Sequence, residues 1–364
     1  MKMLFKIMCS VLVLFVTWTT NAQDNEATNK LKKNQKSFAL VGYGTLGYQS
    51  SGGDGGFTAA TFHPIFVYKM NDKLSFKAEL EIEVADEWDG AFALEFAEFN
   101  YQINNNLAFY GGKFLSPIGA FQSRLHPGWI NKSINAPIGI QNDLNGIKRL
   151  QGDSELGFGF RGAAKSGNMR LNYDIFTTNG PRLTDEGAVD WENGDGDNNN
   201  SPAIGGRLGV LPFKTSNFEL GLSYYSGKAS EKGAADKLNV NLFVVDLSYV
   251  KQTEFGTFDV KGQFNNQKVT DAKYPGTPVP FQEFNNNTSA YYAQLAYRLP
   301  DSKFELVNRI SALDVPNEVA WGADQSRYTL GVNYWLDWNT AIKVGYDFVN
   351  NDDNILGFAF AMGF

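Results

Sequence analysis

Cysteine is almost absent from this chain. The one cysteine, Cys9, lies in an N-terminal segment with the features of a secretion signal. A positively charged start precedes an apolar stretch over 7–17, and small residues provide a cleavage site after Ala22. We therefore expect residues 1–22 to be a signal peptide. The mature chain would have no thiol, which excludes disulfides, thiolate metal sites and cysteine nucleophiles.

Long apolar runs are also missing. No window approaches the about 20 apolar residues of a membrane helix. Mean hydropathy is only −0.30 although 14% of residues are aromatic. In a secreted chain this combination fits a transmembrane β-barrel, whose apolar residues are spread over alternating positions. The formal charge of −7 argues against a nucleic-acid partner.

Histidine is nearly as scarce, since His63 and His126 are the only two. A hydrolase in the outer membrane would need a histidine paired with a serine and a polar orienting group. No serine stands near His63, and nothing visible pairs with His126. The sequence therefore predicts no enzyme and no cofactor.

The chain does contain a two-residue alternation of apolar and polar side chains, from Phe38 to the end. It is clearest over 74–84, and the last ten residues repeat it and end on Phe364. Alternate side chains of a strand point to opposite faces, so one face would meet lipid and the other the lumen. A barrel also gives such strands a neighbour on both edges.

Connection lengths give the number of strands. Short turns are expected at 71–73, 104–106, 165–168, 213–217, 252–256, 300–303 and 337–339. Longer loops are expected near 49–56, 86–90, 116–152, 178–202, 226–237, 266–288, 314–325 and 349–353. Their strict alternation predicts an all-β fold, an antiparallel up-and-down barrel of sixteen strands with short periplasmic turns and long outer loops. Aromatic residues beside several short turns indicate a girdle at the membrane interface.

The predicted barrel covers residues 38–364. The polar segment 23–37 has little periodicity, and we expect a periplasmic tail that is either disordered or a short helix entering the pore. The location that follows is the outer membrane of a Gram-negative cell.

Three stretches carry a family likeness: residues 105–119, with Gly-Lys-Phe followed by Pro-Ile-Gly, residues 330–340, and the aromatic C-terminal strand. They resemble the phosphate-selective porin O/P family and its Bacteroidetes relatives. The resemblance implies a sixteen-stranded, often trimeric diffusion channel. It also implies that selectivity depends on arginines stacked through the pore and lysines near the constriction.

The longest connection, 116–152, is basic in an acidic chain. Folded into the barrel, it would narrow the channel and lower the barrier for anions. Alternatively it packs over its neighbours outside, or contacts lipopolysaccharide phosphates. The candidate constriction residues are Lys113, Arg124, His126, Lys132, Lys148 and Arg149.

Alternation also assigns charged residues of both signs to the lumen. They are Arg161, Arg207, Arg298, Arg309, Arg327, Glu79, Glu81 and Glu83. Such a mixed lumen creates a transverse field but no evident anion ladder. The glutamate stripe could coordinate cations or be structural, and the acidic loop 178–202 offers Asp195 and Asp197 either to calcium or to solvent. We predict no resident metal.

These features predict a passive outer-membrane channel for small hydrophilic solutes, with anionic, phosphate-like solutes among the candidates. The alternative is a non-conducting structural or accessory barrel within an outer-membrane complex. Its expected partners are membrane lipid and lipopolysaccharide, small solutes and, as a homotrimer, copies of itself.

Overall fold

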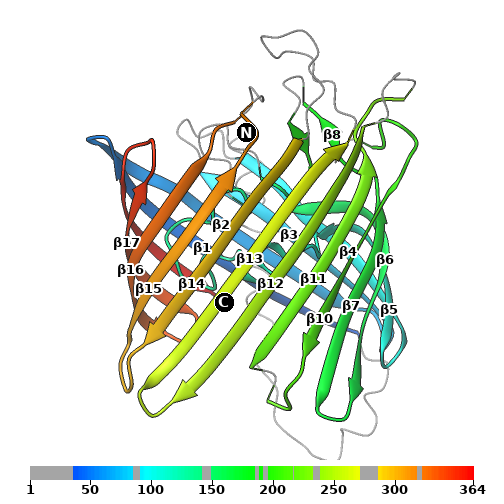
Figure 1. Ribbon diagram of the computed structural model, residues 1–364. Helices are drawn as coiled ribbons and strands as arrows, with labels where there is room; N and C mark the ends of the chain where they lie inside the picture. The colour runs from blue at the N-terminus through cyan, green and yellow to red at the C-terminus, as the bar shows by residue number, and fades with distance from the viewer. Residues whose placement is uncertain are drawn as a thin grey trace, which may run out of the picture.

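The computed structural model describes residues 36–84, 91–141, 149–184, 188–191, 196–215, 217–232, 238–270, 286–317 and 322–364. Its strands form an antiparallel barrel in which neighbours in the chain are neighbours in space (Figure 1). The barrel is closed by the pairing of β18 with β1. Sixteen strands take part, as predicted. The described residues contain no helix long and apolar enough to cross a membrane.

The strands of the barrel have the following bounds. The first seven are β1 (Ser37–Ser51), β2 (Asp54–Lys69), β3 (Leu74–Val84), β4 (Ala91–Asn104), β5 (Leu107–Leu115), β6 (Ser154–Ser166) and β7 (Met169–Thr178). The other nine are β10 (Ala203–Leu211), β11 (Phe218–Lys228), β12 (Asn239–Thr253), β13 (Gly256–Thr270), β14 (Asn286–Arg298), β15 (Phe304–Asp314), β16 (Gln325–Asp337), β17 (Thr340–Val349) and β18 (Ile355–Gly363). A separate hairpin consists of β8 (Arg182–Leu183) and β9 (Val189–Asp190), and η3 (Phe121–Leu125) is a short π-helical turn.

All seven predicted short turns join consecutive strands where expected. One predicted long loop, 49–56, was wrong. There β1 and β2 meet through Gly52 and Gly53 alone, with φ of 62° and 96°. Glycine adopts positive φ without steric cost, so the strands continue to a two-residue hairpin.

The ends of the predicted domains are only partly visible. Strand β1 begins at Ser37, one residue before the predicted barrel. The predicted signal peptide 1–22 and nearly all of the tail 23–37 lie outside the described residues, as do the predicted loop 86–90 and Lys148.

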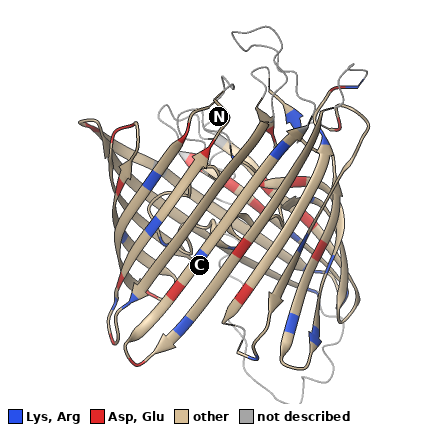
Figure 2. Ribbon diagram, viewed as in Figure 1, with Lys and Arg blue, Asp and Glu red and all other residues tan. Residues whose placement is uncertain are grey.

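The two faces of the wall differ as the alternation predicted. In β18, Leu356 and Phe358 point outward and are 50% and 43% exposed, whereas Ala359 and Ala361 point inward and are buried. At the short-turn end, aromatic rings contact across neighbouring strands, for example Phe304 and Tyr334 at 5.0 Å between centroids. The outer face is thus an apolar band with an aromatic rim, and charged residues are scattered over the strands (Figure 2).

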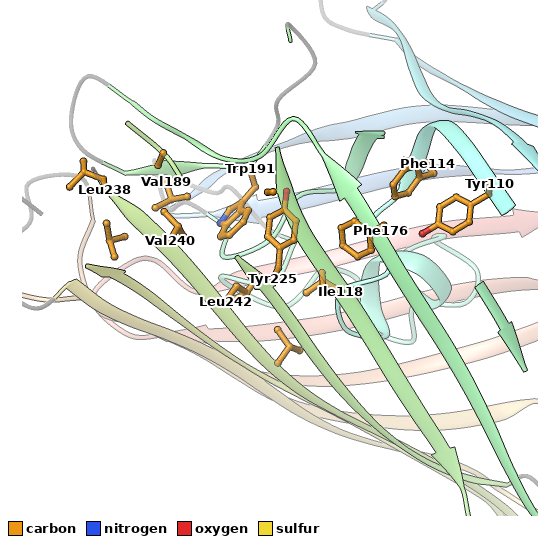
Figure 3. Close-up of a cluster of buried hydrophobic side chains, with 14 residues drawn as sticks. Tyr110, Phe114, Ile118, Phe176, Val189, Trp191, Tyr225, Leu238, Val240 and Leu242 are labelled. Atoms are coloured by element: carbon orange, nitrogen blue, oxygen red, sulfur yellow. The ribbon is translucent and has the colours of Figure 1, made fainter. Parts of the chain in front are cut away.

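Part of the interior is an apolar core. Near the outer-loop end, Trp191 from the segment after β9 packs against Tyr225 of β11, with 5.1 Å between ring centroids (Figure 3). The Trp191 indole also donates to Gln267 Oε1 at 2.8 Å. Phe176 of β7 stacks on the other side of Tyr225 at 5.6 Å. These buried rings fill one side of the lumen.

Candidate functional site

The longest connection folds into the barrel. We call its described part, 116–141 and 149–152, the inner loop. The backbone N–H of Gly119 donates to Ser223 Oγ of β11, and those of Ala120 and Phe121 donate to Gln263 Oε1 of β13, each at 3.1 Å. Because Ser223 and Gln263 are buried inward-facing residues, the inner loop lies in the lumen.

Two cations on nearby strands of the wall also hold the inner loop. Arg309 of β15 donates to Asn131 Oδ1 at 2.5 Å and to the Asn135 carbonyl at 2.7 Å. Lys343 of β17 donates to the carbonyls of Gly128, at 2.5 Å, and Asn131. Arg309 and Lys343 are only 2% and 1% exposed. Their charged groups therefore bind the inner loop and are not accessible to solutes in the lumen.

Glycines in the wall let the inner loop approach closely. Ile134 lies over Gly345 of β17 and Gly357 of β18. A Cβ on Gly357 would stand 2.3 Å from Ile134 Cδ1, a distance that real atoms do not reach. The two glycines leave a space in the wall that Ile134 fills, and we call this space the seat of the loop.

The loop cations that the sequence singled out are paired with carboxylates. Both carboxylate oxygens of Glu219 on β11 accept from Arg124 at 2.9 Å, and Glu305 of β15 accepts from Lys132 at 3.0 Å. Arg149 forms an ion pair with Asp153. The inner loop therefore does not present a run of unpaired positive charge.

Lys113 lies on β5, before the inner loop begins. Lys113 pairs across the sheet with Leu156 of β6, which is 40% exposed, and shares the outward face of β5 with Phe109. Its ammonium donates to the Leu94 carbonyl at 2.6 Å.

His126 is part of a polar cluster between the inner loop and the wall. Its Nε2 lies 3.1 Å from the Tyr43 hydroxyl, and its Nδ1 lies 2.5 Å from the Gln122 carbonyl. The Tyr43 hydroxyl donates to Glu79 at 2.8 Å, and His63 stacks on the Tyr43 ring at 4.2 Å. Burial lowers the pKa of His126, so the ring is neutral at pH 7 and positions the loop.

The other predicted lumen charges all lie on the inner face, but in different surroundings. Glu79 is buried against Tyr43, while Glu81 and Glu83 are partly exposed. Arg327 is buried 3.5 Å from Asp347. Among the described residues no group of three His, Cys, Asp or Glu side chains is placed to hold a metal ion. Asp197 accepts from the Asn199 N–H at 2.9 Å, and Asp195 lies outside the described residues.

A cavity of about 690 Å³ remains between the inner loop and strands β3 to β7 and β10. The charged residues that line it are Lys77, Glu98, Arg124, Arg161, Asp174 and Arg207. The Glu98 carboxylate forms ion pairs with Arg161, at 2.9 Å, and with Lys77, at 3.2 Å. Arg161 also lies 3.5 Å over the Tyr110 ring. The cavity is polar, and its cations are held by ion pairs and by an aromatic ring.

A closed sixteen-stranded barrel narrowed by an inner loop is the architecture of a diffusion channel. A family model for Gram-negative porins matches residues 133–354. The chain belongs to the Gram-negative porin family. As a porin it is a diffusion channel of the outer membrane and not an enzyme.

Solved structures similar to this porin include the outer-membrane channel DcaP of Acinetobacter baumannii, at 10% identity over 94% of this chain and 100% of that one, with a TM-score of 0.59. An anion-selective porin from Comamonas acidovorans matches at 13% identity, over 91% and 100%, with a TM-score of 0.57. OmpT of Vibrio cholerae in a trimer form matches at 11% identity, over 90% and 99%, with a TM-score of 0.56. At these identities the likeness shows the fold alone. Comparison with curated protein sequences finds no match.

One lining residue of the porin was hidden from sequence reasoning. Continuing the outward alternation of Phe92 and Leu94 would place Glu98 outside. A bulge at Glu95 shifts the register, because Glu79 pairs with Phe96 whereas Leu80 pairs with Leu94. Glu98 thereby turns inward. Its neighbour Lys77 could have been found, since it shares the polar face of β3 with Glu79.

Proposed function

We propose that this porin passes small hydrophilic solutes with a preference for anions. The observation that supports the preference is that, in the cavity between the inner loop and strands β3 to β7 and β10, the cations are more exposed than the carboxylates. The side chains of Arg124, Lys77 and Arg161 are 43%, 39% and 29% exposed. Their carboxylate partners Glu98, Glu219 and Asp174 are less exposed, at 5%, 13% and 20%.

A solute in the passage therefore meets cationic groups, while the carboxylates that hold them lie behind. Positive groups in a narrow passage with low-dielectric walls lower the barrier for anions and raise it for cations. Because each cation is already paired, the residual field is modest. We expect a preference and not strict selection.

The resemblance to the phosphate-selective O/P family would make phosphate one of these anions. That family's stacked arginines have no full counterpart in the described lumen, because Arg309 and Arg327 are buried and engaged with the inner loop and Asp347. We therefore propose a preference for small anions as a class, with phosphate-like solutes among them.

The test is the reversal potential of the purified porin in planar bilayers under a salt gradient. We expect an anion-directed potential in the wild type and a shift toward cations in the double variant Lys77→Gln, Arg124→Gln. Arg170→Gln is the matched control, since Arg170 is exposed at the short-turn end of β7 outside the cavity lining. A neutral or cation-directed wild-type potential would refute the preference. Silence in every bilayer would favour the accessory, non-conducting barrel.

We also propose that the porin assembles as a homotrimer in contact with lipid and lipopolysaccharide. The support is the trimer form recorded for OmpT, together with the continuous apolar outer face of this barrel. Native mass spectrometry of the porin in mild detergent should give three times the protomer mass. A monomer at all detergent concentrations would contradict this.

A further inference from the structure

A second cavity, of about 360 Å³, lies between the inner loop and strands β13 to β16. It shares no lining residue with the first cavity, so the two are separate, and we call this second one the recess. Aromatic rings make up much of its wall. They are Phe121 and Trp129 of the inner loop, Tyr292 of β14, Trp335 of β16 and Trp338 of the following short turn.

The recess also has a surplus of positive charge. Asp259 is the one carboxylate in its lining, and it forms an ion pair with Lys261 at 2.5 Å. Lys132 at its edge is occupied by Glu305. Among the described residues, neither Arg298 nor Arg309 forms an ion pair.

The two arginines differ in what they can still bind. Arg309 spends its N–H groups on Gln294 and on the inner loop. Arg298 makes no hydrogen bond to any described residue and lies 5.0 Å from the Trp335 ring centroid. Its fork of N–H donors is thus held over an aromatic face with its hydrogen-bonding capacity unused.

We propose that this recess is a binding subsite for small aromatic carboxylates. A guanidinium binds a carboxylate through two parallel hydrogen bonds, and desolvation by the surrounding rings strengthens that bond. The indoles of Trp129 and Trp338, in edge contact at 5.7 Å, offer apolar surface for the ring of the ligand. The volume suits a single small molecule.

The chemistry of the wall distinguishes this ligand from two others. A purely apolar ligand or a lipid chain would leave the hydrogen-bond donors of Arg298 without an acceptor. A small inorganic anion would leave the aromatic surface uncovered. A ligand with both a carboxylate and a ring satisfies both parts of the recess.

The test is ligand-detected saturation-transfer NMR on the folded porin in nanodiscs, with phenylacetate as the probe. Acetate, which lacks the ring, and 2-phenylethanol, which lacks the charge, are the comparison ligands. The variants are Arg298→Gln and Trp338→Ala. Trp338 is 72% exposed, so its removal is compatible with folding. Arg170→Gln is the matched control, since Arg170 also lies near the short-turn end but does not line the recess.

We expect saturable phenylacetate binding in the wild type and in Arg170→Gln, and affinity at least about tenfold weaker in Arg298→Gln, because a charge-assisted hydrogen bond is lost. Equal affinity in Arg298→Gln and wild type, or 2-phenylethanol binding as tightly as phenylacetate, would overturn the proposal. The measurement needs no ion flow. Failure here would leave the proposed anion preference standing, whereas a silent bilayer would leave this subsite standing.

Discussion

Replacing Gln263 with leucine should release the inner loop from one wall of the barrel. The side chain is 3% exposed, and its Oε1 accepts from the N–H groups of Ala120 and Phe121 at 3.1 Å. Its Nε2 donates to Gln151 of the same loop at 2.9 Å. Leucine is of comparable size but can form none of these hydrogen bonds.

The expected magnitude follows from the two N–H groups. Each would be left buried without an acceptor, at a cost of about 1–3 kcal/mol. The docked state of the loop should therefore lose about 2–6 kcal/mol relative to the undocked state. Even about 2 kcal/mol raises the undocked population roughly thirtyfold.

Single-channel recording would detect the change as more frequent steps to a larger conductance. Gln252→Leu is the matched control, because Gln252 is exposed near the turn between β12 and β13 and makes no contact with the inner loop. Gln263→Glu should lie between wild type and Gln263→Leu, since it keeps an acceptor but loses the donor to Gln151. If Gln263→Leu conducts like wild type, these bonds do not hold the constriction.

Three further predictions concern the inner loop and the start of the mature chain. Gly357→Val should push Ile134 out of its seat and raise conductance, and an unchanged single-channel current would contradict that seat. Burial lowers the pKa of His126 below 6.5, so the undocked loop binds more protons and docking should weaken as pH falls below that value. Noisier wild-type currents at pH 5 that are absent in His126→Asn would show it, and equal noise in both proteins would contradict it. Intact-mass measurement of the outer-membrane form should place its first residue at Gln23, and any other start would move the predicted cleavage site.

The barrel could be predicted because lipid and water sort side chains at every second position. The seven short turns depend only on local residues, so their places were found from sequence alone. The hairpin at Gly52 was misjudged because polar residues around a glycine pair are as common in loops as in tight turns.

The charge state of the inner loop could not be predicted, because its partners are distant in the chain. Arg124 meets Glu219 across 95 residues, and Lys132 meets Glu305 across 173. Composition alone makes these cations appear unpaired. A single bulge at Glu95 was enough to bring Glu98 into the passage against the local alternation.

The anchors of the inner loop also bear on how the molecule is assembled. Tyr43 comes from the first strand, and Lys343, which reaches Gly128 across 215 residues, comes from one of the last. These groups surround the segment together only after the final strand has met the first. The constriction is therefore completed at the end of insertion, and a half-built cylinder would be more permeable than the finished one.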